Sequence, residues 1–357
     1  MESTPIQSSP ESEVGHGNPF IKSVEVSEGC DLSNQAEGSS SKRVSPEDSQ
    51  RLYRQFRQAT LESTARELQK RVQAHADVSN LARPSTDCNR FDPNLSGIAT
   101  MEFLGFRFHP MPKEKAVETL LTLAKSDRTY RVYFANAHSI EVASRNLELS
   151  QALKRSNLLL ADGSGVLLGS RLAGKALVHN LNGTDLIPAL CQSAPQQQPL
   201  SAYFLGAKPG VAQEAAANLA QRYPGLRVAG VRDGYFSEAE LPGVLQAIRD
   251  TQPDVLLVAM GTPLQEIWID RHAGQLPGIV CIAVGGLFDF MAEQVVRAPK
   301  VFRLVGMEWV WRFMMEPTRL WKRYTVGNLI YLQVLAKAWL KEKLGSLNQT
   351  DKAELGL

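Results

Sequence analysis

The sequence predicts an α/β protein with a Rossmann-like open parallel sheet and helices on both faces. First, short runs rich in Val, Leu and Ile show no polar alternation, which is typical of strands buried on both faces of a sheet. Second, amphipathic helical stretches separate these runs in a βαβ rhythm. Third, polar residues follow the runs, at the edge where open parallel sheets bind ligands.

The predicted strands lie at 131–137, 157–163, 200–207, 226–234, 253–261 and 278–286. Helical stretches at 208–223 and 237–250 lie between them. We assign the Rossmann-like domain to 98–300. A tail at 1–48, rich in Ser, Glu and Pro, is predicted to be disordered because it lacks the apolar surface to offset ordering entropy. A helix and a linker follow at 49–97, and a C-terminal helical appendage at 301–357.

Composition excludes several classes of protein. With 357 residues and 43% hydrophobic content, the chain can bury a sizeable core. The net charge of +2 gives no indication of a nucleic-acid partner. Four scattered cysteines without a CxxC pair or a histidine cluster predict neither disulfides nor a metal site. Without a leader or a run of about 20 apolar residues, we expect a cytoplasmic chain that touches a membrane from one side.

Asp162 is the first candidate for chemistry, because it directly follows a predicted strand and precedes two glycines. A carboxylate there can act as a general base on an incoming hydroxyl. The alternative is that Asp162 caps the following helix.

Other polar groups at the same edge have similar pairs of interpretations. Gly206 and Lys208 form a glycine turn before a helix, which favours an anion but also fits an ordinary turn. Gln265 and Glu266 in "GTPLQEIWI" could recognise sugar or base edges, or simply occupy a capped first turn. Thr184 and Asp185 fit either capping or sugar binding. Asp233 and Asp289 also follow strands.

Residues 297–324 combine arginines with aromatic residues. Arginine forks suit bidentate phosphate contacts, and a solvated helix face with arginines paired to Glu308 and Glu316 is the alternative. That alternative does not account for Trp309, Trp311 and Trp321. The arginines are Arg297, Arg303, Arg312, Arg319 and Arg323.

The segment 326–344 has an apolar face interspersed with lysines. Its length and charge argue against spanning, and an amphipathic helix in the headgroup region is the natural interpretation. A core-packing or dimerising helix is the alternative, so self-association stays open.

Taken together, ten blocks resemble the WecG/TagA/CpsF glycosyltransferases (glycosyltransferase family 26) in order and spacing, over roughly residues 98–330. They include "NAHSIEVA", "LADGSGV", "NGTDL", "FLGAKPGVAQEAAANL", "PDVLLVAMGTPLQEIWI", "VGGLFDF", "RAPKVFR" and "EPTRLWKRY". Among subgroups, "YFANAH" and "NLNGTDL" look most similar to the GumM type of exopolysaccharide glucosyltransferase.

The resemblance implies inverting transfer of a hexose, expected to be glucose, from a UDP-sugar to a polyprenyl-diphosphate-linked saccharide. The reaction would take place at the inner face of the plasma membrane, where the appendage docks, without a metal or other cofactor. The alternative within the family is a UDP-N-acetylmannosamine or uronic acid transferase for enterobacterial antigen or teichoic acid type glycans. A non-catalytic membrane-associated scaffold is the alternative of another class. An NAD-dependent enzyme is disfavoured, because GxGxxG is absent after the first strand.

Residue roles carry over by resemblance. Asp162 matches the general base, and Arg312, Arg319 and Arg323 match appendage arginines that would neutralise departing UDP. The chain departs from the family pattern at Phe134, Asn180 and Glu293, near the presumed sugar pocket. The residues expected to bind the donor or acceptor are Asn136, Thr184, Asp185, Gly206, Lys208, Asp233, Gln265, Glu266, Gly286, Asp289 and Arg297.

Overall fold

The computed structural model describes residues 92–175, 177–295, 298, 299, 302, 307–315 and 317–340, with the backbone alone at Arg319 and Lys322. The predicted tail (1–48) and nearly all of the predicted helix and linker (49–97) lie outside these residues. Arg297, Arg303 and the end of the appendage, 341–357, lie outside them as well.

The centre of the fold is a parallel sheet of 6 strands, as predicted, and the strands lie in the order β4-β3-β8-β7-β5-β6. Each predicted apolar run contains one strand. The strands are β3 (Tyr130–Ala135), β4 (Leu158–Ala161), β5 (Leu200–Gly206), β6 (Leu226–Arg232), β7 (Val255–Ala259) and β8 (Val280–Ala283). The chain leaves β3 for the edge strand β4 and then crosses to β5 in the other half. This reversal is the arrangement that opens a crevice at the carboxyl ends of the strands.

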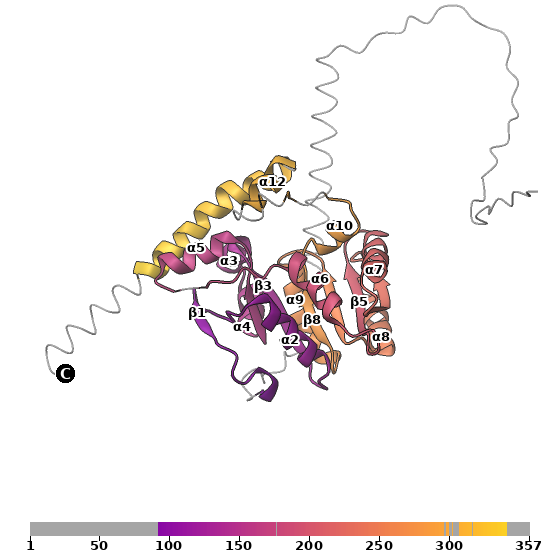
Figure 1. Cartoon of the computed structure of the whole chain (residues 1–357). Coiled ribbons are helices and arrows are strands. Elements are labelled where there is room, and N and C mark those ends of the chain that lie inside the picture. Colours follow the sequence, from indigo (N-terminus) through magenta and orange to yellow (C-terminus); the bar gives the residue numbers. More distant parts are fainter. Residues whose placement is uncertain are drawn as a thin grey trace, which may run out of the picture. The chain divides into compact units, whose positions relative to one another are not determined.

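Helices cover both faces of the sheet (Figure 1). One hydrophobic core lies under α2 (Lys113–Ala124), α6 (Gly183–Ser193), α7 (Val211–Arg222) and α10 (Leu287–Met291). The other lies under α3 (Ala137–Ala143), α4 (Leu147–Lys154), α5 (Ser164–Leu172), α8 (Leu241–Thr251) and α9 (Leu264–His272). Within β3, Val132 and Phe134 belong to the first core, and Tyr133 and Ala135 to the second. Because both faces are buried, the strands need apolar residues at consecutive positions.

Four short elements complete the body of the fold. The strands β1 (Met101–Phe103) and β2 (Phe106–Phe108) form an antiparallel hairpin whose turn residues, Leu104 and Gly105, have φ values of 52° and 78°. The 3-10 turns are η2 (Pro93–Leu95) and η3 (Ala273–Gln275). The sequence did not predict the hairpin, because each strand has only 3 residues.

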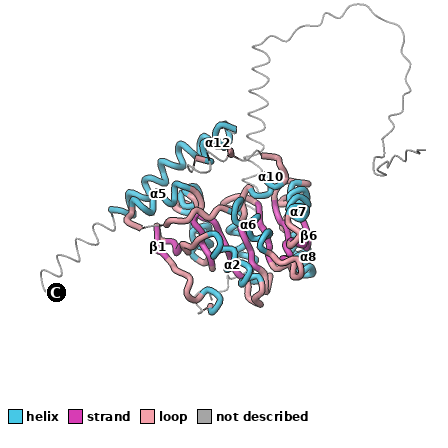
Figure 2. The backbone as a smooth tube through the Cα atoms, viewed as in Figure 1, coloured by secondary structure: helices cyan, strands magenta, loops and turns pink. Residues whose placement is uncertain are grey.

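The C-terminal segment returns across the catalytic domain. It consists of α12 (Glu308–Met315), α13 (Pro317–Lys322), the π-helical turn η4 (Arg323–Gly327) and a helix at 328–340. Figures 1 and 2 show this last helix running beside α5. Tyr331 is 4% exposed, and its hydroxyl donates to the carbonyl oxygen of Gly165 over 3.1 Å.

Some apolar side chains of the helix at 328–340 are buried against the core, and others are exposed. Tyr331, Val334 and Leu335 pack on the core, whereas Leu329 and Leu332 are more than half exposed. The core-packing alternative therefore holds for part of this helix. None of the helices in the described part of the chain has the length and apolar character needed to cross a bilayer.

Candidate active site

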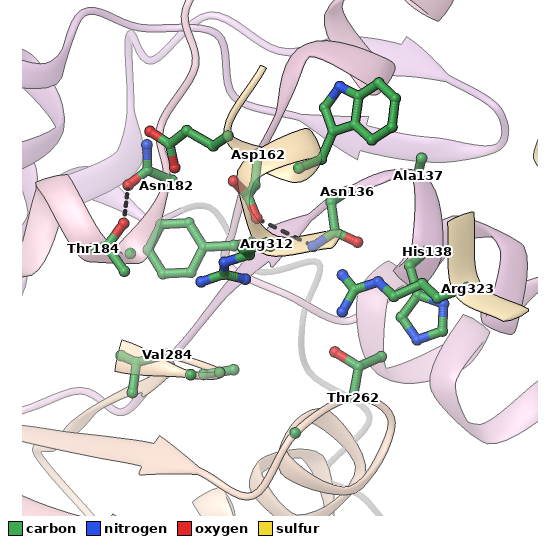
Figure 3. A pocket seen from close by; sticks show the side chains of 18 of the residues that line it. Asn136, Ala137, His138, Asp162, Asn182, Thr184, Thr262, Val284, Arg312 and Arg323 are labelled. Atoms are coloured by element: carbon green, nitrogen blue, oxygen red, sulfur yellow. Dashed lines mark hydrogen bonds between the residues drawn. The ribbon is translucent and has the colours of Figure 1, made fainter. Parts of the chain in front are cut away.

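A cleft with a volume of about 1390 Å³ opens at the carboxyl ends of the strands. Its walls come from the loops after all 6 strands of the parallel sheet, from α5 and from the C-terminal helices. Figure 3 shows its central residues. Of the predicted site residues, the cleft brings together Asn136, Asp162, Thr184, Lys208, Gln265, Gly286, Asp289, Arg312 and Arg323.

Asp162 and Asn136 lie side by side because their strands pair in register, with Ala161 opposite Ala135. The Nδ2 of Asn136 donates to the Oδ2 of Asp162 over 3.1 Å (Figure 3). The Oδ1 of Asn136 accepts from the backbone N–H of Ser139 as part of a capping box on α3, so this amide is held from both ends. Asp162 itself caps nothing, because Gly163 occupies the N-cap position of α5. The capping alternative for Asp162 is therefore wrong.

The charge state of Asp162 is set by opposing effects. Burial raises the pKa of this carboxyl, whereas the hydrogen bond from Asn136 and the charges of Arg312 and Arg323 lower it, and Asp185 raises it. The net result is a pKa above the ordinary value. A carboxylate with a raised pKa is a stronger proton acceptor at neutral pH than an ordinary aspartate.

Two arginines of the C-terminal segment line the cleft. Arg312, from α12, lies over the ring of Phe290 at 4.6 Å from its centroid. Arg323, from η4, lies beside His138 (Figure 3) and 6.0 Å from the ring centroid of Tyr324. Aromatic contacts between Trp309 and Tyr324 hold α12 against this turn. For Arg319 the structure describes only the backbone, so its predicted contact stays a prediction, and Arg297 is not described.

Gln265 lines the cleft but acts mainly on the backbone. Its Oε1 accepts from the N–H of Gly261 over 3.2 Å and from the N–H of Gly285 over 3.0 Å. One amide therefore ties the turn after β7 to the turn after β8.

Glu266 does not line the cleft, contrary to expectation. Its side chain is 1% exposed, and its Oε1 accepts from Thr262 over 3.0 Å and from Gln265 over 2.8 Å. Burial raises the pKa of Glu266. Glu266 therefore stabilises the turn after β7 and does not face the cleft.

Asp185, Gly206 and Asp233 also lie outside the cleft lining. Asp185 accepts from the side-chain amide of Asn182, the residue that caps α6. Asp233 accepts from the N–H of Tyr235 in a tight turn. Gly206 has a φ of 130°, and a Cβ there would lie 2.4 Å from the carbonyl oxygen of Ala259. Each of these residues shapes the wall without forming part of its surface.

Sequence reasoning missed several residues of the cleft. They are Asn182, His138, Thr262 and Tyr235, together with Leu168, Arg171 and Leu172 of α5. Burial lowers the pKa of His138 to about 4, and Arg323 and Arg145 act in the same direction, so this imidazole is neutral at pH 7. Its Nδ1 lies 3.2 Å from the Oε2 of Glu141. The only available signal was its place in the helix start that follows β3.

The fold and the cleft are those of a glycosyltransferase. A model of the glycosyl transferase WecG/TagA/CpsF family matches residues 101–345, and the chain belongs to this family. Two curated relatives have the name N-acetylglucosaminyldiphosphoundecaprenol N-acetyl-beta-D-mannosaminyltransferase. The one from Bacillus spizizenii is 33% identical over 51% of this chain and 69% of its own length. The one from Staphylococcus aureus strain MW2 is 30% identical over 70% of this chain and 96% of its own length.

These relatives correct the predicted reaction. Glucosyl transfer in exopolysaccharide synthesis is wrong as the expected function, because the relatives are named for N-acetylmannosaminyl transfer, the alternative within the family. Asn180 accepts from the N–H of Gly163 over 2.7 Å, and the buried ring of Phe134 packs against Gly183. Asn180 therefore fixes the turn after β4, and Phe134 both packs against Gly183 and lines the cleft.

Proposed function

We propose that this enzyme transfers N-acetylmannosamine from UDP-N-acetylmannosamine to N-acetylglucosamine carried on a polyprenyl diphosphate, with inversion at the anomeric carbon. The names of the relatives support the transferred sugar and the acceptor. The observation that carries the mechanism is the pairing of Asp162 and Asn136 in one cleft with Arg312 and Arg323.

Asp162 accepts the proton of the acceptor hydroxyl as that oxygen attacks the anomeric carbon. Asn136 holds the carboxylate in place through its hydrogen bond to Oδ2. The new bond joins the acceptor oxygen to the anomeric carbon, and the bond from that carbon to the UDP oxygen breaks. Asp162 keeps the proton until the product leaves.

The leaving UDP carries the electron pair and needs nearby positive charge. Arg312, Arg323 and Lys208 line the cleft and supply guanidinium and ammonium groups for the diphosphate. The exposed ring of Tyr235 offers a stacking face for the base, and Asp289 offers a carboxylate at the same rim. We propose that these groups suffice without a divalent cation.

We further propose that the enzyme works at the inner face of the plasma membrane. The C-terminal segment exposes large apolar side chains, among them Trp309, Met314, Trp321, Leu329 and Trp339, each at least 45% exposed. Such side chains suit the interfacial region of a bilayer, where a polyprenyl-linked acceptor is found.

The test is to incubate the full chain with UDP-N-acetylmannosamine and N-acetylglucosaminyl-diphosphoundecaprenol in EDTA and to identify the lipid product by mass spectrometry. The expected product carries one added N-acetylmannosamine. No product in EDTA but full turnover with Mg²⁺ would contradict the metal-independent mechanism. Transfer of a different sugar from a panel of UDP-sugars would contradict the donor.

A further inference from the structure

One end of the cleft is apolar and has no role in the mechanism above. Leu168 and Leu172 of α5 are 58% and 67% exposed, and both line the cleft. Leu332 faces the same space from the helix at 328–340. Exposed leucines that gather at one end of a ligand cleft indicate an apolar ligand or partner.

A cation lies among these leucines. Arg171 of α5 is exposed and lines the cleft. Among the residues that the structure describes, none forms an ion pair with Arg171. Leu172 directly follows Arg171 in the sequence, and Leu168 precedes Arg171 by three positions. Leu168 and Leu172 are therefore one helical turn apart on α5. A guanidinium group between leucines matches a ligand in which an anionic group is joined to a hydrocarbon chain.

The two walls of this end are fixed by a close helix contact. A Cβ at Gly169 would lie 2.5 Å from the hydroxyl of Tyr331 and 3.1 Å from Leu335. Gly169 therefore lets the helix at 328–340 approach α5, and the hydrogen bond from Tyr331 to Gly165 fixes the register. We call this contact, formed by Gly165, Gly169, Tyr331 and Leu335, the α5 seam.

The proposed base, Asp162, and Arg171 lie at opposite ends of α5. Asp162 directly precedes the N-cap of α5, and Arg171 lies in its last turn. The axial rise from Ser164 to Arg171 is about 10 Å at 1.5 Å per residue. Arg171 therefore lies about two helical turns from the start of α5, which leaves room for a sugar between it and the proposed base.

We propose that Arg171 binds the diphosphate of the lipid-linked acceptor and that Leu168, Leu172 and Leu332 contact the first isoprene units of its chain. This inference rests on the proposed acceptor class. It assigns a place on α5 to the lipid diphosphate and leaves Arg312 and Arg323 to the diphosphate of the donor.

The charge is tested with the full-length variant Arg171→Gln and its matched control Arg222→Gln, an exposed arginine on α7 away from the cleft. We expect Arg171→Gln to raise the KM for N-acetylglucosaminyl-diphosphoundecaprenol at least about tenfold, since a hydrogen bond to a charged group is lost. UDP binding, measured by calorimetry, should not change. A KM equal to that of Arg222→Gln, or an equal loss of UDP affinity, would overturn the assignment.

The lipid contact is tested with Leu172→Gln and the control Leu147→Gln, a leucine on α4 that is 72% exposed and outside the cleft. Leu172→Gln should raise the KM for the undecaprenyl acceptor severalfold and leave that for a short-chain alkyl diphosphate acceptor unchanged. Equal effects on both acceptors would contradict the lipid contact. An equal loss of binding to acceptor-free phospholipid vesicles would reassign Leu172 to the bilayer.

Failure of the proposed donor is distinguished by direct binding of the undecaprenyl acceptor in detergent without donor, followed by tryptophan fluorescence. If the wild-type chain binds this acceptor and Arg171→Gln does not, the inference stands even where UDP-N-acetylmannosamine is not used. If the wild-type chain and Arg171→Gln bind this acceptor equally well, the inference fails regardless of the donor.

Discussion

The side-chain amide of Asn136 donates a hydrogen bond of 3.1 Å to the carboxylate of Asp162, across the ends of two paired strands. The oxygen of this amide caps α3, so the position of Asp162 depends on a helix start in the neighbouring βα unit. The proposed base is thus fixed by backbone geometry on both sides.

Asp162→Asn should lower kcat by about 10²–10⁴-fold, because an amide cannot accept the acceptor's proton. UDP affinity should stay close to that of the wild type. Product formation by mass spectrometry and UDP binding by calorimetry separate the two effects. Retention of more than a tenth of the wild-type turnover would exclude Asp162 as the base.

The same substitution should raise Tm at neutral pH. Since the pKa of Asp162 is raised in the folded state, the folded protein binds this proton more tightly than the unfolded chain. The ionised carboxylate therefore costs stability above the folded pKa, and the cost vanishes below the ordinary carboxyl pKa. Thermal melts of the wild type and Asp162→Asn should converge as the pH falls through this window. A constant difference in Tm would contradict this explanation.

The acid limb of the pH profile should move in opposite directions in two variants. Arg312 lowers the pKa of Asp162, so Arg312→Gln should shift the limb to higher pH. Asp185 raises that pKa, so Asp185→Asn should shift the limb to lower pH. The measurement is kcat/KM against pH. Shifts of the same sign would show that the limb belongs to another group.

Gly169→Ala should impair turnover. Alanine favours a helix interior by about 1 kcal/mol over glycine, but its Cβ would displace the hydroxyl of Tyr331 and disturb the helix that follows Arg323. We expect kcat to fall at least about tenfold, as misplaced groups cost rate steeply.

The matched control for this prediction is Gly243→Ala, a glycine inside α8 with open space around its Cβ position. It should gain stability and keep full turnover, whereas Gly169→Ala should gain less because its Cβ displaces Tyr331. Unchanged kcat in Gly169→Ala would mean that the α5 seam does not position the arginines.

Gly206→Ala should destabilise the fold more than Gly210→Ala. Both glycines have positive φ values, 130° and 85°, so alanine strains both by about 1–3 kcal/mol. Only Gly206 also faces backbone atoms of Ala259 at 2.4 Å, whereas Gly210 has open space. Urea denaturation should show the larger loss for Gly206→Ala, and equal losses would contradict the packing argument.

The sheet was predictable because strands buried on both faces need unbroken apolar runs, and each run can be read without knowledge of its neighbours. Asp162 was predictable for a related reason, since parallel strands bring their carboxyl ends to one edge. The hairpin at 101–108 was not, because 3 residues per strand give no periodic signal.

The convergence of Arg312 and Arg323 on Asp162 came from the resemblance and not from spacing. It depends on long-range packing, with Tyr331 against Gly165 and Gly169, which no local pattern encodes. The donor was misassigned because "YFANAH" and "NLNGTDL" were taken to indicate the GumM type, whereas Asn180 in the second block fixes the Gly163 turn.

The bridge made by Gln265 has an electrostatic consequence. Turns that follow parallel strands commonly present unoccupied backbone N–H groups to a phosphate. Here the N–H groups of Gly261 and Gly285 already donate to one amide oxygen. Two dipoles that could have met an anion are satisfied within the protein, so this edge of the sheet offers less positive potential than its architecture suggests. The positive charge that balances a bound anion must therefore come from side chains in other parts of the chain.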